Sequence, residues 1–537
     1  MDGDAPREEP TDPSAELPGP AGDLPDQFAG LGPGQLQRRA ARGAAWTATS
    51  ALISVPLAFV ANLLVARLIG PAAYGEVAVL SLVIGLASVA TDLGFSGGVI
   101  QWGASAYARG DDAEVVELLR TSLGWRLLLR LPVLAALVVV FGIGQGPVVV
   151  GVLVASVVFS ALFGGAALAI TIENRTAAAA RLTMIFSAVL QVSVVAVAYL
   201  TRRAVDVWAT RMFVGAAFIP LNLLLLPPAR RAVVLRPRFP RHLPPRFWRY
   251  CLYSAAGGLV GVLAGSRSEV FVLELFHDPV AVGLFALAFG LAAHITAPVD
   301  ALLGPLGPAV TGIVGSAPDR APAAFLRALR YSALLSGALM ATLLPAVALL
   351  VPVLYGHEYS LTSELVVPLG VASCLASMLN PVVAFVSAHR QARLLLLVTV
   401  WALAVDGALA FLLVPRLGAW GAVSANLVAG LVPFPVLVRH ELRALGLSLR
   451  GILRASRAFY VGLIALALGF GSASALPLGA IDRGLLAALV GGVVFLGGVR
   501  LSGGGLPLAD RGPLLELIPS GLRDHAGLAL RLLGGRA

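Results

Sequence analysis

The sequence predicts an all-α, polytopic membrane protein with about 14 transmembrane helices. Three observations lead to this fold class: the apolar composition, the recurrence of long apolar runs, and the placement of the arginines. Of the 537 residues, 58% are hydrophobic and 13% are charged, whereas a soluble chain of this length needs roughly a quarter charged residues to cover its surface. Lipid is therefore the expected solvent for most of this chain.

The first element is the segment 1–36, which differs from everything after it. It contains eight acidic residues, one arginine and many prolines, and such a segment buries too little apolar surface to fold. It also lacks the basic start and the apolar core of a signal peptide. We expect a disordered cytoplasmic tail.

The apolar runs that follow have the length that spans a bilayer, which is about 20 residues in a helix. The turn sequence GIGQGP separates two of them, and the last run is short and rich in glycine. The predicted helices cover residues 44–66, 76–100, 122–142, 147–170, 181–200, 207–227, 250–275, 280–303, 330–353, 363–387, 394–414, 419–438, 458–477 and 483–501.

The arginines predict how these helices are oriented. The net charge is +10, and all 39 basic residues are arginines. Because they lie between apolar runs, they indicate membrane topology rather than nucleic-acid binding. Alternate segments, such as PPARRAVVLRPRFPRHLPPRFWRY, are rich in arginine, and cytoplasmic loops carry this excess. We therefore expect a multi-pass protein of the cell membrane with both termini in the cytoplasm. The segments predicted to face outward hold Arg67, Arg202, Arg203, Arg416 and Arg483.

Sequence patterns for catalysis, metal binding or a cofactor are absent. Cys251 and Cys374 lie in apolar runs, which is typical of small buried side chains rather than of a disulfide or a metal site. There is no HExxH motif, no CxxC pair and no phosphate-binding loop. The short outer loops leave little chain for a folded external active site. We predict that the protein is not an enzyme and needs no cofactor.

A weak internal repeat relates the two halves of the chain. Aligning RLIGPAAYGEVAVLSLVIGLASVATDLG with LFHDPVAVGLFALAFGLAAHITAPVDAL places Gly75 opposite Gly283. Each glycine ends a short turn that contains a proline and begins an apolar helix. Seventeen residues later each helix carries an aspartate, Asp92 in the first half and Asp300 in the second. Internal repeats with a site between the halves are a common transporter architecture.

Four stretches of this sequence resemble a known family. They are LVARLIGPAAYGEVAVLSLVIGLASVATDLGFSGGVI, SRSEVFVLELFHDPVAVGLFALA, PVLYGHEYS and LVPRLGAWGAVSANLVAG. Together they resemble the bacterial polysaccharide flippases of the multidrug/oligosaccharidyl-lipid/polysaccharide exporter (MOP) superfamily, over roughly residues 38–440. The resemblance implies two pseudo-symmetric six-helix lobes facing each other across a central cavity, with two further helices at the C-terminal end. The first, second, seventh and eighth helices would line a V-shaped cavity.

The same resemblance implies the function. The protein would move a lipid-linked oligosaccharide from the inner to the outer leaflet by alternating access, for cell-surface polysaccharide biosynthesis. Its expected partners are the lipid-linked glycan, membrane lipids, a proton or sodium ion, and polysaccharide-assembly proteins. The predicted organisation is a tail (1–36), an N-lobe (37–228), a basic cytoplasmic loop (229–249), a C-lobe (250–440), an amphipathic segment with two helices (441–501), and a cytoplasmic tail (502–537).

Arginines within the predicted helices are the candidate substrate-binding residues. A lipid-linked sugar carries a phosphate or pyrophosphate, and arginine stays charged and binds phosphate with two hydrogen bonds. The candidates are Arg267, Arg211, Arg67, Arg126 and Arg130. The alternative for each is a side chain that reaches the headgroups from near a helix end.

Acidic residues within the helices are the candidates for coupling to an ion. A carboxylate in a low-dielectric cavity can bind and release a proton, and the candidates are Asp92, Asp300, Asp406 and Glu269. Asp92 could instead cap a helix or pair with an arginine. In one straight helix Arg267 and Glu269 point about 200° apart, so we expect Arg267 to face the cavity and Glu269 to lie at a helix contact, unless the glycine-rich stretch before them bends.

Five embedded amides could bind sugar or join helices by hydrogen bonds. They are Asn62, Gln191, Asn222, Asn380 and Asn426. Three other functions stay open at this point: a flippase for a lipid-linked peptidoglycan precursor, an ion-coupled exporter of small cationic drugs with an acidic cavity, and a membrane glycan polymerase.

Overall fold

The computed structural model describes residues 33–173, 176–239, 243, 245–264, 267–276, 278–303, 310, 313–314, 318–389 and 391–506. Throughout these residues the regular structure is helical and contains no β-strand, which confirms the predicted all-α class. Most of the two predicted tails, 1–36 and 502–537, lies outside the described residues.

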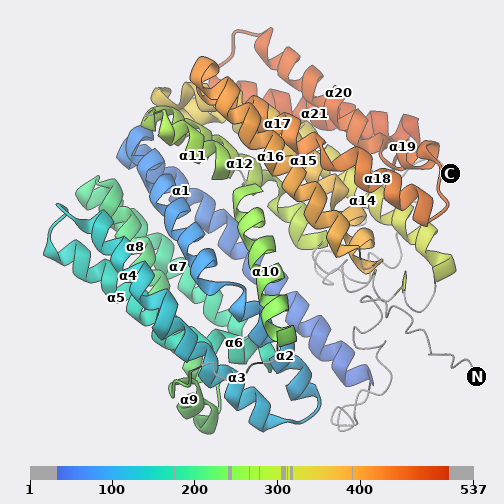
Figure 1. Ribbon diagram of the computed structural model, residues 1–537. Helices are drawn as coiled ribbons and strands as arrows, with labels where there is room; N and C mark the ends of the chain where they lie inside the picture. The colour runs from blue at the N-terminus through green and yellow to red at the C-terminus, as the bar shows by residue number, and fades with distance from the viewer. Residues whose placement is uncertain are drawn as a thin grey trace, which may run out of the picture.

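The first group of helices, which we call the N-bundle, occupies the lower left of Figure 1. It consists of α1 (Pro33–Asp92), α2 (Phe95–Ala108), α3 (Asp112–Trp125), the π-helical segment η2 (Arg126–Arg130), α4 (Leu131–Gly142), α5 (Pro147–Phe163), α6 (Gly165–Ile172), α7 (Thr176–Thr201), α8 (Ala204–Ala217), the 3-10 helix η3 (Ile219–Leu225) and α9 (Pro228–Val234).

The second group, the C-bundle, follows after α10 (Pro245–Ala264) and lies at the upper right of Figure 1. It consists of α11 (Arg267–Leu275), α12 (Pro279–Leu303), the 3-10 helix η4 (Pro318–Arg320), α14 (Ala321–Tyr355), the 3-10 helix η5 (His357–Tyr359), α15 (Ser360–Ala388), α16 (Ala392–Leu417), α17 (Ala419–Leu431), α18 (Pro433–Ala444), α19 (Leu449–Ala455), α20 (Arg457–Ser474) and α21 (Ala480–Ser502).

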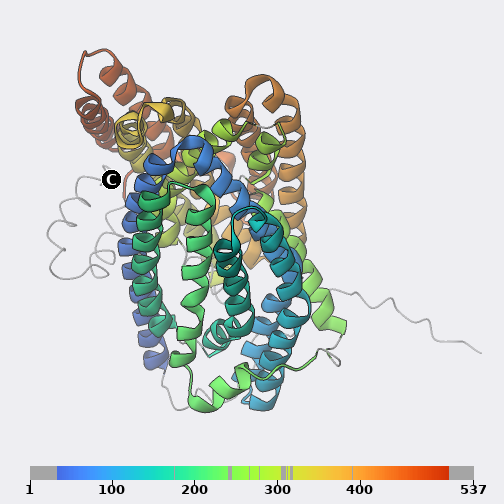
Figure 2. The same ribbon diagram turned by 90° about the vertical axis from the view of Figure 1, so that its left-hand side faces the viewer.

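Helix α1 is broken near its middle and forms two arms. At Gly70 the backbone angles (φ 79°, ψ 168°) leave the helical region, and the positive φ suits glycine, which has no Cβ. A straight helix of 60 residues would be about 90 Å long, three times the thickness of the hydrocarbon core. Figure 2 shows the two blue arms of α1 running down from a common turn at the top. We call this end of the molecule the Gly70 end.

The number of membrane-spanning helices differs from the prediction of 14. Among the described residues, 12 helices are long and apolar enough to cross a membrane, or up to 13 if α10 and α11, which are bent by 59°, form one span. The first two predicted helices, 44–66 and 76–100, share α1, and the segment Ile53–Asp92 counts once. The short run near 483–501 meets the criterion as α21.

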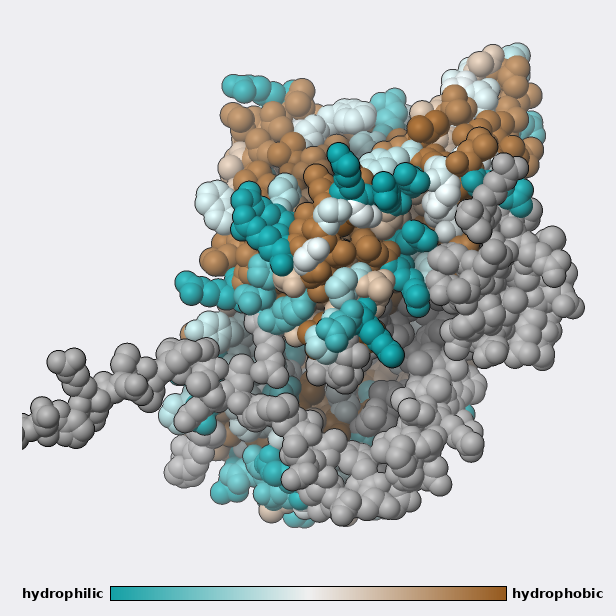
Figure 3. Space-filling view, turned by 90° about the vertical axis from the view of Figure 1, so that its right-hand side faces the viewer, coloured by the Kyte–Doolittle hydropathy of each residue, from teal (hydrophilic) through white to brown (hydrophobic). Residues whose placement is uncertain are grey.

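The outer surface of the bundles is apolar, as a lipid solvent requires. On α21 the exposed side chains Leu485, Leu489 and Val493 follow one another at intervals of four residues and are 64%, 66% and 64% exposed. Figure 3 shows hydrophobic residues over much of the face that it presents. These exposed apolar helices identify the chain as a multi-pass membrane protein.

Small residues join the last two helices to the C-bundle. A Cβ atom on Gly491 of α21 would lie 2.0 Å from the carbonyl oxygen of Ala341 in α14, and one on Gly462 of α20 would lie 2.7 Å from the Cα of Gly337 in α14. Such close backbone approach is typical of helix pairs in membranes, where lipid removes the hydrophobic drive for helix association. α14, α20 and α21 therefore form one packed unit.

Candidate functional site

The two halves of the sequence repeat contact each other in the structure. Gly75 in the second arm of α1 packs against Gly283 in α12. A Cβ atom on Gly75 would lie 2.4 Å from the carbonyl oxygen of Pro279, and one on Gly283 would lie 1.9 Å from that of Pro71. Each glycine thus meets the proline that stands four residues before the other glycine. A reciprocal contact of this kind is what a two-fold relation between two similar units produces.

Two further hydrogen bonds join the N-bundle to the C-bundle at the Gly70 end. The Tyr359 hydroxyl donates to the Ala66 carbonyl oxygen at 2.8 Å, and both residues are buried. Arg67 Nη1 donates to the Leu354 carbonyl oxygen at 3.2 Å, in the last turn of α14. A cation is favourable at the C-terminal end of a helix dipole. Arg67 is exposed, and it lies at a contact between the two bundles.

The seventh predicted helix is divided into two halves that lie between the bundles. Its first half, α10, packs against α2, where Gly94 has a positive φ (70°) and a Cβ atom on it would lie 2.1 Å from the Cys251 carbonyl oxygen. Phe247 of α10 packs edge-on against Phe95 and Trp102 of the N-bundle. The first half also contacts α1 and, in the C-bundle, α16. The second half, α11, contacts α12, α16 and α17 of the C-bundle and also α1. The two halves are bent by 59° relative to each other, and a bend at the glycine-rich stretch was the alternative to a straight helix.

A buried pair of carboxylates connects α11 to α16 and α17. Glu269 is fully buried, and Asp406 of α16 is 5% exposed. The Ser268 hydroxyl lies within hydrogen-bond distance of both, at 3.1 Å from Glu269 Oε2. The Asn426 side-chain nitrogen donates to Glu269 Oε1 at 2.7 Å. We call these four residues the acid cluster.

No positively charged side chain that the structure describes compensates the acid cluster. Neither carboxylate forms an ion pair with any residue that the structure describes, and Asp406 Oδ1 is buried without a hydrogen-bond partner there. Leaving two ionised carboxylates in such an environment costs several kcal/mol for each ion. A single hydroxyl also has only one hydrogen to donate, so Ser268 can satisfy only one ionised carboxylate. The geometry is suited to holding a proton or a small cation.

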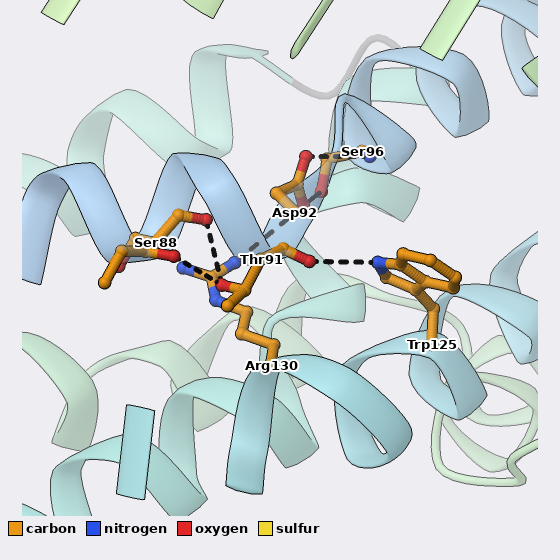
Figure 4. A network of polar contacts seen from close by, with 7 residues as sticks. Ser88, Thr91, Asp92, Ser96, Trp125 and Arg130 are labelled. Carbon is orange, nitrogen blue, oxygen red and sulfur yellow. Dashed lines mark hydrogen bonds and ion pairs between the residues drawn. The ribbon is translucent and has the colours of Figure 1, made fainter. Parts of the chain in front are cut away.

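The two acids related by the repeat have different partners. Asp92 accepts hydrogen bonds from the Ser96 hydroxyl (2.6 Å) and backbone nitrogen (3.2 Å), at the start of α2. Its Oδ1 lies 4.0 Å from Arg130 Nη1, and Figure 4 shows these two side chains pointing toward each other between α1 and η2. Asp92 therefore has both features of the alternative interpretation, since it bonds to the first turn of a helix and faces an arginine.

Asp300 instead joins α12 to α15. Its Oδ1 accepts hydrogen bonds from the Ser377 hydroxyl at 3.0 Å and from the Asn380 side-chain nitrogen at 2.9 Å. Two of the embedded amides, Asn380 and Asn426, thus bond to acidic side chains on other helices, and Asn62 bonds to the Tyr74 hydroxyl. Asn380 and Asn426 therefore join separate helices, which was one of the two roles open to the amides, and Asn62 joins the two arms of α1.

The candidate arginines are not gathered in one site, although Arg126 and Arg130 lie together. Arg126 and Arg130 lie four residues apart on η2, and π-helical turns are frequent at functional sites. Arg126 is 5% exposed and bonds to none of the described residues, and its Nη1 lies where a Cβ on Gly164 would clash at 2.3 Å. Arg211 is half-buried on α8. The side chain of Arg267, which begins α11, lies outside the described part of the structure.

Sequence reasoning missed Ser268 as part of a site. Ser268 and Asp406 are 138 residues apart, and a serine between two charged residues in an apolar run gives no signal of such a contact. The four acids were identified, but no sequence pattern paired Glu269 with Asp406.

Comparison with known proteins identifies the family. A family model described as "Polysaccharide biosynthesis protein" matches residues 64–364, more than half of the chain. The chain belongs to the polysaccharide biosynthesis protein family. The predicted resemblance to the polysaccharide flippases is thereby confirmed at the level of the family. No curated protein matches the chain.

Solved structures show the same fold at low sequence identity. The structure titled "Lipid II flippase MurJ, inward closed conformation" is 12% identical, with a TM-score of 0.61, and the match covers 85% of this chain and 98% of that one. An inward-facing multidrug resistance MATE family transporter of the MOP superfamily is 17% identical, with a TM-score of 0.53 and coverage of 74% and 99%. The family member described here therefore has the MOP transporter fold.

Proposed function

We propose that this protein moves a lipid-linked oligosaccharide, joined to its lipid by phosphate or pyrophosphate, from the inner to the outer leaflet by alternating access. The observation that carries the proposal is the reciprocal contact of Gly75 and Gly283. It closes the Gly70 end between two repeat-related helices, and separating the bundles there would open that end. With the arginine-rich segments in the cytoplasm, the Gly70 end faces outward and both termini lie inside.

The substrate headgroup is anionic, and the arginines on the helices are its proposed ligands. Arg126 is suited to this role because it is buried and carries a guanidinium that bonds to no described residue. Arg130 lies one turn away and shares its surroundings with Asp92. Arg211 and Arg267 are further candidates, whereas Arg67 has a role in the contact at the Gly70 end.

The acid cluster is the proposed coupling site. Binding of a proton or a sodium ion between Glu269 and Asp406 would remove the cost of two uncompensated buried charges. Because Glu269 lies on α11 and Asp406 on α16, occupancy would fix the second half of the divided helix to the C-bundle. Its first half contacts α1 and α2 of the N-bundle as well as α16, so the state of the cluster can bias how the bundles sit relative to each other.

The acid cluster also favours a second candidate, an ion-coupled exporter of small cationic compounds on the same fold. The two candidates differ in the charge that the transport path selects. Expression of the protein in a cell that lacks its own exporters, followed by measurement of cationic dye retention, separates them. Lower retention of the dye supports the exporter.

The transport of a lipid-linked glycan is tested by deletion of the gene. Lipid-linked oligosaccharide should then accumulate on the cytoplasmic leaflet, and the wild-type gene should reverse this. Arg126→Gln should fail to restore transport, whereas Arg416→Gln, at an exposed position near the Gly70 end, should restore it. Accumulation of a lipid-linked peptidoglycan precursor would identify that substrate instead, and no accumulation of either would contradict the proposal.

A further inference from the structure

A strongly basic surface lies where the C-bundle leads into its last two helices. The segment 433–457 contains five arginines and a single acid. The acid, Glu441, is fully buried and lies 3.3 Å from His389 Nδ1. The arginines are all exposed: Arg439, Arg443, Arg450, Arg454 and Arg457. The exposed charge of this segment is therefore entirely positive.

The side chains of helix α19 lie on three different faces of the helix. Ile452 and Ala455 face the protein and are 8% and 2% exposed. Leu449 and Leu453, four residues apart and on one side, are 57% and 45% exposed. Arg450 and Arg454 form the next stripe, about 100° further round the helix. Large leucines beside arginines on one exposed helix face are typical of a helix that lies in a membrane interface.

The position of α19 agrees with this. It contacts α14 and α20, both long enough to cross a membrane, and it joins directly to the start of α20. Arg457 Nη1 donates to the Ser502 carbonyl oxygen at 2.7 Å, which ties the start of α20 to the end of α21. Figure 3, which faces this side of the molecule, shows hydrophilic residues next to hydrophobic ones. A helix at the ends of three spans lies at the height of the lipid headgroups.

We infer that α18 and α19 form a binding surface for anionic lipid, with the headgroup phosphates on Arg450 and Arg454 and the acyl chains against Leu449 and Leu453. The exposed leucines favour lipid over an acidic protein segment as the ligand. Acidic side chains could pair with the arginines but would leave Leu449 and Leu453 exposed to water, whereas acyl chains would cover them. Each arginine near an anionic surface strengthens binding, and the loss of two should weaken it roughly thirty-fold. This surface is separate from the acid cluster and from the arginines of η2.

The test uses the full chain in a neutral detergent, with phosphatidylglycerol and phosphatidylcholine as probes. Native mass spectrometry counts bound lipids during a titration of each. We expect preferential binding of phosphatidylglycerol, weakened about thirty-fold in the double variant R450Q/R454Q and less than two-fold in R202Q/R416Q, whose arginines are exposed elsewhere.

A second variant tests the apolar half of the surface. L449Q/L453Q keeps every arginine and should weaken the binding of phosphatidylglycerol as well, because its acyl chains lose their contact. Equal binding of the two lipids by the wild-type chain would overturn the inference, and so would equal losses in R450Q/R454Q and R202Q/R416Q. Unchanged binding in L449Q/L453Q would overturn the placement of α19 in the interface.

Discussion

A methyl group added at Gly283 should force the two bundles apart at the Gly70 end. The added Cβ would lie 1.9 Å from the Pro71 carbonyl oxygen, and ordinary contact begins at 3.4 Å, so α1 and α12 must separate by about 1.5 Å (3.4 − 1.9). The atoms that the added Cβ would meet, in the Pro71 carbonyl group and at the Gly75 nitrogen, belong to backbone, which cannot move aside as a flexible side chain can. Overpacking of this kind costs about 1–3 kcal/mol.

This cost applies only to the conformation in which the helices touch. Gly283→Ala should therefore shift the population toward a conformation open at the Gly70 end by roughly 5- to 150-fold. Spin labels at Leu200 and Leu417, which are 77% and 52% exposed on a helix of each bundle, report the separation by pulsed electron resonance. The distance distribution should move to longer values.

Gly290→Ala is the matched control for this experiment. Gly290 lies on the same helix, and a Cβ atom there meets nothing within 4 Å. It should leave the distances unchanged and stabilise α12 by about 0.5–1 kcal/mol, the usual gain from alanine in a helix. Identical distance distributions for Gly283→Ala and Gly290→Ala would refute the role of this contact as a closure.

Three further outcomes are expected. Asp406→Asn should lower ion-driven transport by ten-fold or more while substrate binding persists, because the acid cluster loses a carboxylate. Glu364→Gln, at an exposed site, is the control. Ion-driven transport by Asp406→Asn equal to that of Glu364→Gln would contradict the coupling role. Asp92→Ala should lower the free energy of unfolding by about 1–2 kcal/mol through the loss of the bonds to Ser96, with transport per folded molecule retained; chemical denaturation measures the first and a transport assay the second. Gly491→Ala should destabilise the chain by about 1–3 kcal/mol, because a Cβ there would lie 2.0 Å from the Ala341 carbonyl oxygen. Gly497→Ala, on the same helix, should not destabilise the chain, because a Cβ there meets nothing within 4 Å. Equal melting temperatures of the two variants would argue against the packed unit of α14, α20 and α21.

Local features of the fold could be predicted from the sequence because they depend on nearby residues. Apolar runs located the helices. The angle of about 200° between Arg267 and Glu269 on a straight helix led to the expectation that Glu269 lies at a helix contact, and the structure buries it against α16 and α17. The spacing of Gly75 and Gly283 within their repeats singled out two residues that touch. The break at Gly70 was less visible, because a helix can resume directly after a kink, and this left two predicted helices within one element.

Contacts between distant segments could not be predicted in the same way. The acid cluster forms only if Glu269, Asp406 and Asn426 lie at the same level along the packed helices α11, α16 and α17. That level depends on the packing of the whole C-bundle. Asp92 and Asp300 stand at equivalent repeat positions, yet among the residues that the structure describes only Asp92 faces an arginine. η2 supplies Arg130 beside Asp92, and α15 supplies Asn380 beside Asp300. Spacing alone does not distinguish these environments.

The most direct test of the proposed transport is the movement of a fluorescent polyprenyl-pyrophosphate-linked oligosaccharide in proteoliposomes. A membrane-impermeant quencher reports the fraction of label in the outer leaflet over time. Vesicles with the wild-type protein should exchange the label between leaflets faster than empty vesicles, and Gly283→Ala should change that rate while Gly290→Ala does not. Label exchange by the wild-type protein that is no faster than in empty vesicles, under every ion gradient applied, would contradict the proposed transport.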